Sequence, residues 1–139
     1  MSSVESNLIE VLKNEIENKS LACMVLQNQV GFTHTDRGVS PIVEFWSRDY
    51  LKDAIVVDKV IGKASAIFMV KGGVAYAYGF VVSELACKVF EEAGIKYCAE
   101  KIVPNIINRT GDGMCPMESA VADIEDIDKG INIILEKTC

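Results

Sequence analysis

The chain of 139 residues has 14 basic and 20 acidic side chains, a formal net charge of −6, and 50% of its residues are hydrophobic. This length and composition predict a single domain, residues 1–139, with an ordinary hydrophobic core, and exclude collagen-like, disordered and disulfide-scaffold classes. An acidic chain without a basic run also argues against partners such as nucleic acid or an anionic membrane surface.

The five cysteines indicate a reducing compartment, because their number is odd and no two of them form a C-x-x-C pair. Glu5 stands where a secretory signal would have basic charge. The longest apolar stretches, such as residues 64–70, are far shorter than the roughly 18 residues of a membrane-spanning helix. We therefore expect a cytoplasmic protein without a membrane segment.

The first third of the chain predicts a helix, a hairpin and a short second helix. Apolar residues recur at helical spacing over residues 3–18. Two apolar segments, 22–26 and 30–35, flank a polar turn and are typical of a β-hairpin. Ser40 followed by Pro41 is typical of a helix start, with the serine as N-cap.

The middle of the chain predicts a helix, a strand and another helix. Asp58 is expected to open the first of these helices, which the glycines at 72–73 end. Alternation over residues 74–78 predicts a strand. Ser83 and Gly94 are expected to begin and end the next helix.

The last third predicts a strand over residues 95–103 and two helices, which begin near Pro116 and Asp126. Helices thus alternate with strands after an opening hairpin. This order is typical of an α/β protein built as a three-layer α/β/α sandwich on a mixed sheet.

A loop that contains two glycines leads into the helix start at Pro116. Such a loop presents unpaired N–H groups, which bind phosphate or carboxylate, and an arginine beside it would add a bidentate donor for the same anion. The pattern fits neither a Walker nor a Rossmann motif. On this feature alone we favour a well-capped turn over a binding loop. The candidate ligand-binding residues of this segment are Asn108, Arg109, Gly111, Gly113 and Glu118.

Cys115 falls at the N-cap of the same helix, where a thiolate would be stabilised. As a nucleophile it would need a general base, and the only histidine, His34, lies far away in the sequence. The simpler interpretation is a small residue tolerated at an N-cap.

Lys59 and Lys63 are four residues apart and would share one face of the helix that Asp58 opens. They could point at a ligand anion or act as amines of lowered pKa, although solvated surface lysines are the ordinary alternative. Gly62 between them costs a helix about 1 kcal/mol relative to alanine, which calls for a packing or access explanation.

Zinc deaminases use this order of elements, with H-x-E or C-x-E at one helix start and P-C-x-x-C at the next. Here Glu84 stands where the first cysteine of the second motif belongs, and Cys87 where the second belongs. Residues 58–65 contain no histidine, cysteine or glutamate at all. The sequence therefore predicts no metal site, and Glu84 is equally explained as a carboxylate near a helix start.

Four motifs together resemble a family of uncharacterised bacterial and archaeal proteins that have the fold of cytidine deaminase. The first three are DRGVSP at 36–41, DKVIGKA at 58–64 and VSE at 82–84. The fourth consists of NR at 108–109, Gly111, Gly113 and CPME at 115–118. The resemblance covers nearly the whole chain. It implies a cytidine-deaminase-like fold that has lost its zinc, and it implies no particular activity.

In an open α/β sheet, ligands bind beyond the carboxyl ends of the strands, where helix starts gather. We expect such a site here, with positive charge from lysine and arginine. The candidate ligand-binding residues are Arg37, Asp58, Lys59, Lys63, Ser83, Glu84, Asn108, Arg109, Gly111, Gly113 and Glu118.

The leading hypothesis is a binder of a nucleotide-like or other small anionic ligand that uses neither metal nor cofactor. One alternative is a metal-independent enzyme with Cys115 as nucleophile and Lys63 or Lys59 as proton carrier or anion clamp. Another is a zinc-dependent nucleoside or base deaminase. The sequence leaves a homo-oligomer open.

Overall fold

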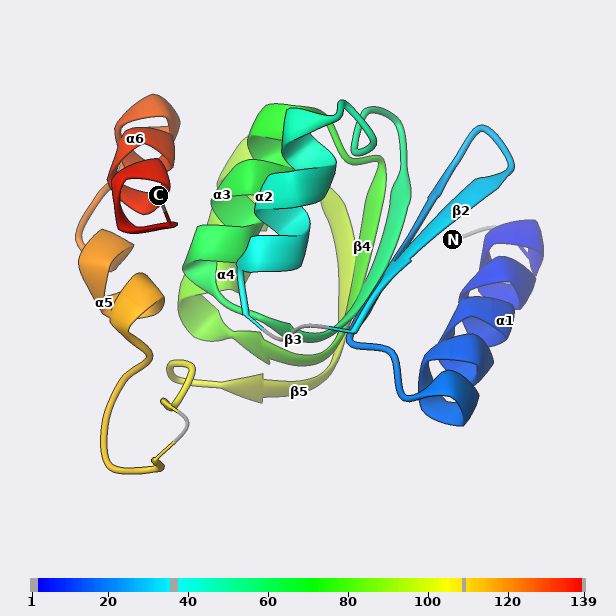
Figure 1. Ribbon diagram of the computed structural model, residues 1–139, viewed down its shortest axis with the longest axis horizontal. Helices are drawn as coiled ribbons and strands as arrows, with labels where there is room; N and C mark the ends of the chain where they lie inside the picture. The colour runs from blue at the N-terminus through cyan, green and yellow to red at the C-terminus, as the bar shows by residue number, and fades with distance from the viewer. Residues whose placement is uncertain (1–2, 36–37, 109, 139) are drawn as a thin grey trace.

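Helices and strands alternate along most of the chain in the computed structural model, which describes residues 3–35, 38–108 and 110–138 (Figure 1). None of the described helices combines the length and the apolar character that crossing a membrane needs. In chain order the elements are α1 (Ser3–Lys19), β1 (Cys23–Gln27), β2 (Val30–His34), α2 (Ser40–Ser47), β3 (Ile55–Ile61), α3 (Lys63–Gly72), β4 (Tyr76–Ser83), α4 (Glu84–Ala93), β5 (Lys96–Val103), α5 (Pro116–Val121) and α6 (Ile127–Thr138).

The described strands form one mixed sheet in the order β2-β1-β3-β4-β5. Strand β1 is antiparallel to both β2 and β3, whereas β3, β4 and β5 run parallel to one another. The carboxyl ends of the three parallel strands therefore lie at one edge of the sheet, which we call the carboxyl edge. Helices α3 and α4 begin there, because each follows its strand after one residue or none.

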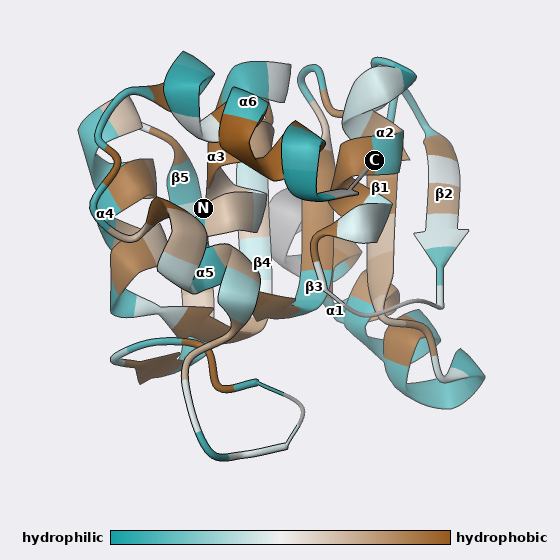
Figure 2. Ribbon diagram, turned by 60° about the vertical axis from the view of Figure 1, so that its left-hand side comes forward, coloured by the Kyte–Doolittle hydropathy of each residue, from teal (hydrophilic) through white to brown (hydrophobic). Residues whose placement is uncertain are grey.

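Helices cover both faces of the sheet, as the α/β/α expectation requires. Helix α1 packs on one face, where Ile9 and Leu12 meet Val57 and Tyr78 of the central strands. Helices α2 to α6 lie on the other face, over a larger core that includes Phe68 of α3 (Figure 1). Figure 2 shows hydrophobic segments on β1 and β3, inside the sheet, and also on helices such as α4 and α6.

The prediction of a helix from Asp58 is wrong, because this residue lies inside β3. There it pairs with Cys23 of β1 and with Gly79 of β4. The β-branched residues on both sides of it favour a strand that is buried between two neighbours. The helix begins at Lys63 instead, so Lys59 and Lys63 do not share a helical face.

Most other predicted elements are confirmed within a few residues. Gly73 and Gly94 follow α3 and α4 in the left-handed conformation, with φ of 83° and 73°. The hydroxyl of Ser83 accepts a hydrogen bond of 3.1 Å from the N–H of Ala86, as an N-cap does. Helix α2 begins one residue earlier than expected, since its N-cap is Val39.

Candidate functional site

The carboxylate of Glu118 joins three segments of the chain at the carboxyl edge. Its residue is 1% exposed. Oε1 accepts hydrogen bonds of 2.7 Å from the N–H of Lys63 and from the hydroxyl of Ser83. Oε2 accepts a further bond from the N–H of Ile106. Glu118 therefore ties the starts of α3 and α4 to the segment that follows β5.

This arrangement gives Glu118 and Ser83 a structural role. Both carboxylate oxygens already accept bonds, and the serine hydroxyl both donates and accepts. Glu118 stands three residues after the N-cap Cys115, where a capping box would pair its carboxylate with the N–H of Cys115. That N–H donates instead to the carbonyl of Ile106 at 2.7 Å. The same carboxylate explains Gly62, where an added Cβ would lie 3.2 Å from Glu118 Oε1.

The described residues do not fit a zinc site. Among them, no group of three or more His, Cys, Asp or Glu side chains lies close enough to hold a metal ion. Glu84 is exposed at the start of α4, and Cys87 is buried in the core. Between the two helix starts lies the carboxylate of Glu118, whose oxygens are engaged by protein donors.

The loop before α5 is closed by its own side chains. Oδ1 of Asn108 accepts hydrogen bonds from the N–H groups of Gly111 at 2.9 Å and Asp112 at 3.2 Å. The hydroxyl of Thr110 donates to Asp112 at 2.6 Å, and hydrogen bonds from Thr110 and Asn108 lower the pKa of Asp112. These N–H groups, predicted to cradle an anion, are thus used within the loop, beside a carboxylate. Together with Gly113, which accepts from the N–H of Asn108, they form a capped turn.

Two predicted ligand-binding residues, Arg37 and Arg109, lie outside the described residues.

A cavity of about 310 Å³ opens at the carboxyl edge beside β3 and β4. We call it the edge cavity. Polar and apolar groups share its wall, and a neighbouring cavity of about 430 Å³ over residues 103–107 shares Val60 and Val81 with it. The residues that line the edge cavity are Ala22, Gly38, Asp58, Lys59, Val60, Phe80 and Val81.

Asp58 is the buried polar group of the edge cavity, with 5% of its surface exposed. Oδ1 accepts a hydrogen bond of 3.3 Å from the N–H of Val60, whereas Oδ2 has no hydrogen-bond partner among the described residues. Burial raises the pKa of Asp58 to about 7, against the opposing effect of the nearby donor groups of Val60, Cys23 and Lys59. The carboxyl group can therefore change protonation state near neutral pH.

Lys59 brings positive charge to the same cavity. It is half-buried in β3, and its ammonium forms no ion pair among the described residues. Asp58 and Lys59 are thus the predicted site residues that the structure does bring together. The sequence pattern indicated both residues but not the burial of Asp58, which a charged residue within a β-branched apolar run could have indicated.

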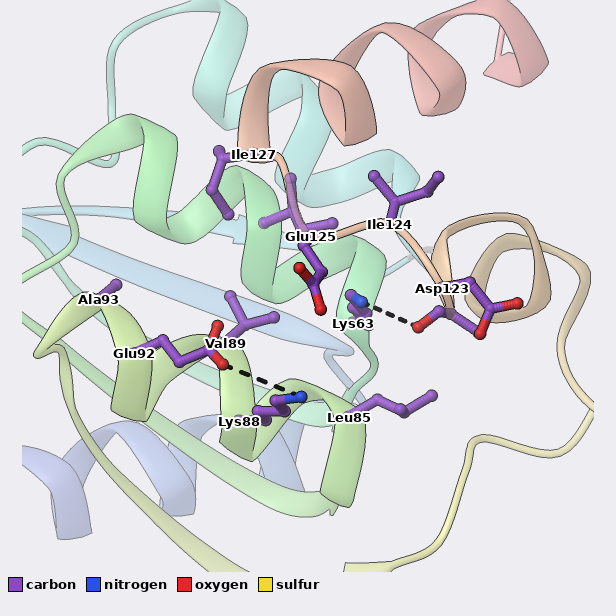
Figure 3. A pocket seen from close by; sticks show the side chains of 12 residues that line it. Lys63, Leu85, Lys88, Val89, Glu92, Ala93, Asp123, Ile124, Glu125 and Ile127 are labelled. Carbon is purple, nitrogen blue, oxygen red and sulfur yellow. Dashed lines mark hydrogen bonds and ion pairs between the residues drawn. The ribbon is translucent and has the colours of Figure 1, made fainter.

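The structure does not bring Cys115 and Lys63 together. Cys115 lines a small cavity of about 40 Å³ with Ser65 and Glu118. The side chain of Lys63 extends into a different cavity, where its Nζ donates a hydrogen bond of 3.0 Å to the carbonyl of Ala122 (Figure 3). His34 pairs with Glu44 at 3.0 Å. Neither the side chain of Lys63 nor that of His34 therefore lies beside the thiol of Cys115 as a general base.

The fold and the site define an α/β protein whose parallel strands end at a ligand-sized cavity. The chain belongs to the family described as a domain of unknown function (DUF1893), whose model matches residues 11–138. It is similar to the crystal structure of a DUF1893 family protein from Thermotoga maritima, with 31% sequence identity and a TM-score of 0.88. That match covers 94% of this chain and 90% of the other chain. A search of curated proteins found no match.

Proposed function

We propose that this protein binds a small, nucleotide-like anionic ligand in the edge cavity, without a metal ion. The observation behind the proposal is the half-buried Lys59 in the lining of that cavity, whose ammonium forms no ion pair among the described residues. A cation without a partner at a cavity of ligand size favours a ligand with an anionic group. The buried Asp58 lines the same cavity.

Charge and shape support the same class of ligand. The half-buried Lys59 offers a cation for a phosphate or carboxylate group. Asp58 opposes an anion only weakly, because its raised pKa leaves the carboxyl group partly protonated near neutral pH. Phe80 and Val60 add an apolar wall for a ring.

A cytidine-deaminase-like fold, as the sequence resemblance implies, is part of this proposal. Its support is the adjacency of the starts of α3 and α4, the two places where deaminases carry their zinc ligands. Here Glu118 bridges these starts. We do not include zinc-dependent deamination in the proposal, because the described residues offer no matching ligand set.

The alternative of an enzyme with Cys115 as nucleophile has less support. The cavity beside the thiol has a volume of about 40 Å³, which is too small for a substrate of nucleotide size. Of its lining residues, Glu118 would be the base, and its oxygens are engaged.

A thermal-shift screen tests the binding proposal. The melting temperature is measured with nucleosides, nucleotides, sugar phosphates, dicarboxylates and inorganic phosphate at neutral pH. We expect a nucleotide-like anion to raise it, since a ligand at 100 times its Kd adds about 2.7 kcal/mol. The shift should fall strongly in Lys59→Ala, which removes the cation of the cavity.

The matched control is Lys96→Ala, which removes an exposed lysine at the opposite end of the parallel strands. This variant should keep the full shift. The proposal is wrong if no compound stabilises the protein, or if Lys59→Ala responds as strongly as the unmodified chain.

A further inference from the structure

A second cavity, of about 350 Å³, lies in the helical layer (Figure 3). We call it the Lys63 cavity. Helix α4 forms one side, residues 122–127 form the other, and α3 contributes Lys63 and Ile67. Its wall mixes aliphatic and charged side chains: Ile67, Leu85, Val89, Ile124 and Ile127 on the one hand, and Lys63, Lys88, Glu92, Asp123 and Glu125 on the other.

Lys63 is a buried amine with unused hydrogen-bonding capacity. Its residue is 8% exposed, and its Nζ donates one hydrogen bond, to the carbonyl of Ala122. An ammonium group has three donors, so two of them have no partner among the described residues. Burial, followed by the charge of Lys88, lowers the pKa of Lys63. An acceptor entering the cavity, above all a carboxylate, could accept hydrogen bonds from these two donors and would favour the charged form of the amine.

A simple anion is nevertheless a poor fit, because three carboxylates surround the same cavity. Glu92, Asp123 and Glu125 are all exposed, and Glu92 lies 3.9 Å from the ammonium of Lys88. These acidic groups would repel a ligand of purely negative charge and attract an ammonium group. The charges around the cavity therefore match a ligand that has both signs.

The aliphatic wall favours a ligand that has an apolar group in addition to a carboxylate and an ammonium group. Ile67 and Val89 are buried, and Leu85, Ile124 and Ile127 are half-buried around the cavity. An apolar group of the ligand that packs against them is removed from contact with water. This burial stabilises binding by about 25 cal/mol per Å² of apolar surface. A volume of about 350 Å³ is at the lower end of the range for ligand cavities and suits a small molecule.

We propose that the Lys63 cavity binds a free α-amino acid with an aliphatic side chain. Its carboxylate accepts hydrogen bonds from Nζ of Lys63. Its ammonium group lies near Asp123 and Glu125, and its side chain packs against Ile67 and Val89. This site is separate from the edge cavity and does not depend on the function proposed for it.

Binding of L-leucine, measured by isothermal titration calorimetry on the full chain, tests the proposal. Three analogues isolate the three requirements: leucine amide lacks the carboxylate, N-acetyl-leucine lacks the ammonium group, and glycine lacks the side chain. We expect leucine to bind and each analogue to bind at least about tenfold more weakly. For leucine amide and N-acetyl-leucine this is the factor expected for one hydrogen bond to a charged group. For glycine it reflects the lost burial of the apolar side chain. The proposal is overturned if leucine does not bind, or if leucine amide binds equally well.

Variants locate the site. Lys63→Met keeps most of the aliphatic stem and removes the amine, so it should weaken leucine binding at least about tenfold. Should this variant fail to fold, the double change Asp123→Asn with Glu125→Gln affects exposed residues only and should weaken leucine binding in the same way. Unchanged affinity in whichever variant folds overturns the proposal.

Two controls separate this site from other effects. Lys129→Met removes an exposed lysine of α6 that does not line the cavity, so it should bind leucine like the unmodified chain. Asp58→Asn should also bind leucine normally, because Asp58 lines the edge cavity instead. Loss of leucine binding in Asp58→Asn would contradict the assignment of leucine to the Lys63 cavity.

Discussion

The carboxylate of Glu118 accepts a hydrogen bond of 2.7 Å from the backbone N–H of Lys63, which lies 55 positions earlier in the chain. The same oxygen accepts a bond from the hydroxyl of Ser83. A helix start leaves N–H groups unpaired and has a partial positive charge, which a carboxylate stabilises. One buried side chain thereby holds the starts of α3 and α4 close to α5.

We expect Glu118→Gln to destabilise the protein. The amide oxygen can still accept from Lys63 and Ser83, but the amide nitrogen would face the N–H of Ile106, donor against donor. Such an unsatisfied buried donor costs about 1–3 kcal/mol. Glu118→Ala, which loses all three bonds, should cost more. Urea unfolding measures the free energy of unfolding of both variants. The control is Glu136→Gln, at an exposed position of α6. A Glu118→Gln protein as stable as this control would show that the carboxylate does not hold these segments.

Gly62→Ala should destabilise the protein by crowding the surroundings of the Glu118 carboxylate. An added Cβ would lie 3.1 Å from Cγ1 of Ile106 and 3.2 Å from Oε1 of Glu118. Crowding in a well-packed site typically costs about 1–3 kcal/mol. The matched control is Gly31→Ala, since no atom of the described residues lies within 4 Å of the position its Cβ would take. Thermal unfolding compares the two, and equal melting temperatures would contradict this account of Gly62.

The helix ends were predictable because they follow local rules. Ser83 accepts a bond from an N–H three residues later, and Gly73 and Gly94 adopt a left-handed conformation that glycine favours. The strand β3 was not predicted, because Asp58 and Lys59 interrupt its apolar pattern. Only the neighbouring strands β1 and β4 make that position buried, and they are remote in the sequence.

The candidate site was predictable only in part, for a similar reason. Asp58 and Lys59 do line one cavity, whereas Lys63 extends into another. The direction of a side chain at a helix start depends on the packing of helices that the sequence does not place. The closed turn around Asn108 is local, by contrast, and asparagine is known to bond to backbone N–H groups that follow it.

Tyr78→Phe should weaken the attachment of α1 to the sheet. The hydroxyl of Tyr78 donates a hydrogen bond of 2.6 Å to Glu100, whose carboxylate lies 3.0 Å from Nζ of Lys13. Loss of that bond should cost about 0.5–1.5 kcal/mol near neutral pH. The control is Tyr50→Phe, whose ring stacks on Phe32 and whose hydroxyl has no hydrogen-bond partner in the part of the chain that the structure describes.

The same variant tests an alkaline effect. Burial and the hydrogen bond to Glu100 raise the pKa of Tyr78 from 10.0 to about 12. The folded chain therefore keeps this proton more tightly than the unfolded chain, so the contribution of Tyr78 to stability is lost as the pH rises from 10 to 12. Tyr78→Phe should lose less stability over that range in urea unfolding. An identical loss in both proteins would show that Tyr78 does not titrate in this way.

Asp58→Asn should change how stability depends on pH. The ordinary pKa of this carboxyl is 3.8, and burial raises it to about 7. Between these values the folded chain holds more protons than the unfolded chain, so the contribution of Asp58 to stability is complete below pH 3.8 and is lost as the pH rises to 7. The loss is on the order of 1.4 kcal/mol for each pKa unit.

Asparagine cannot ionise in this range, so the Asp58→Asn protein should lose less stability between pH 4 and pH 8 than the unmodified chain. We therefore expect it to be the more stable of the two at pH 8, provided that no ligand is bound. Urea unfolding at pH 5 and at pH 8 measures the difference. Asp53→Asn is the matched control, because this exposed aspartate has a positive φ of 56°, which asparagine also adopts readily. If Asp58→Asn and Asp53→Asn show the same dependence on pH, the buried carboxyl of Asp58 does not titrate near neutrality.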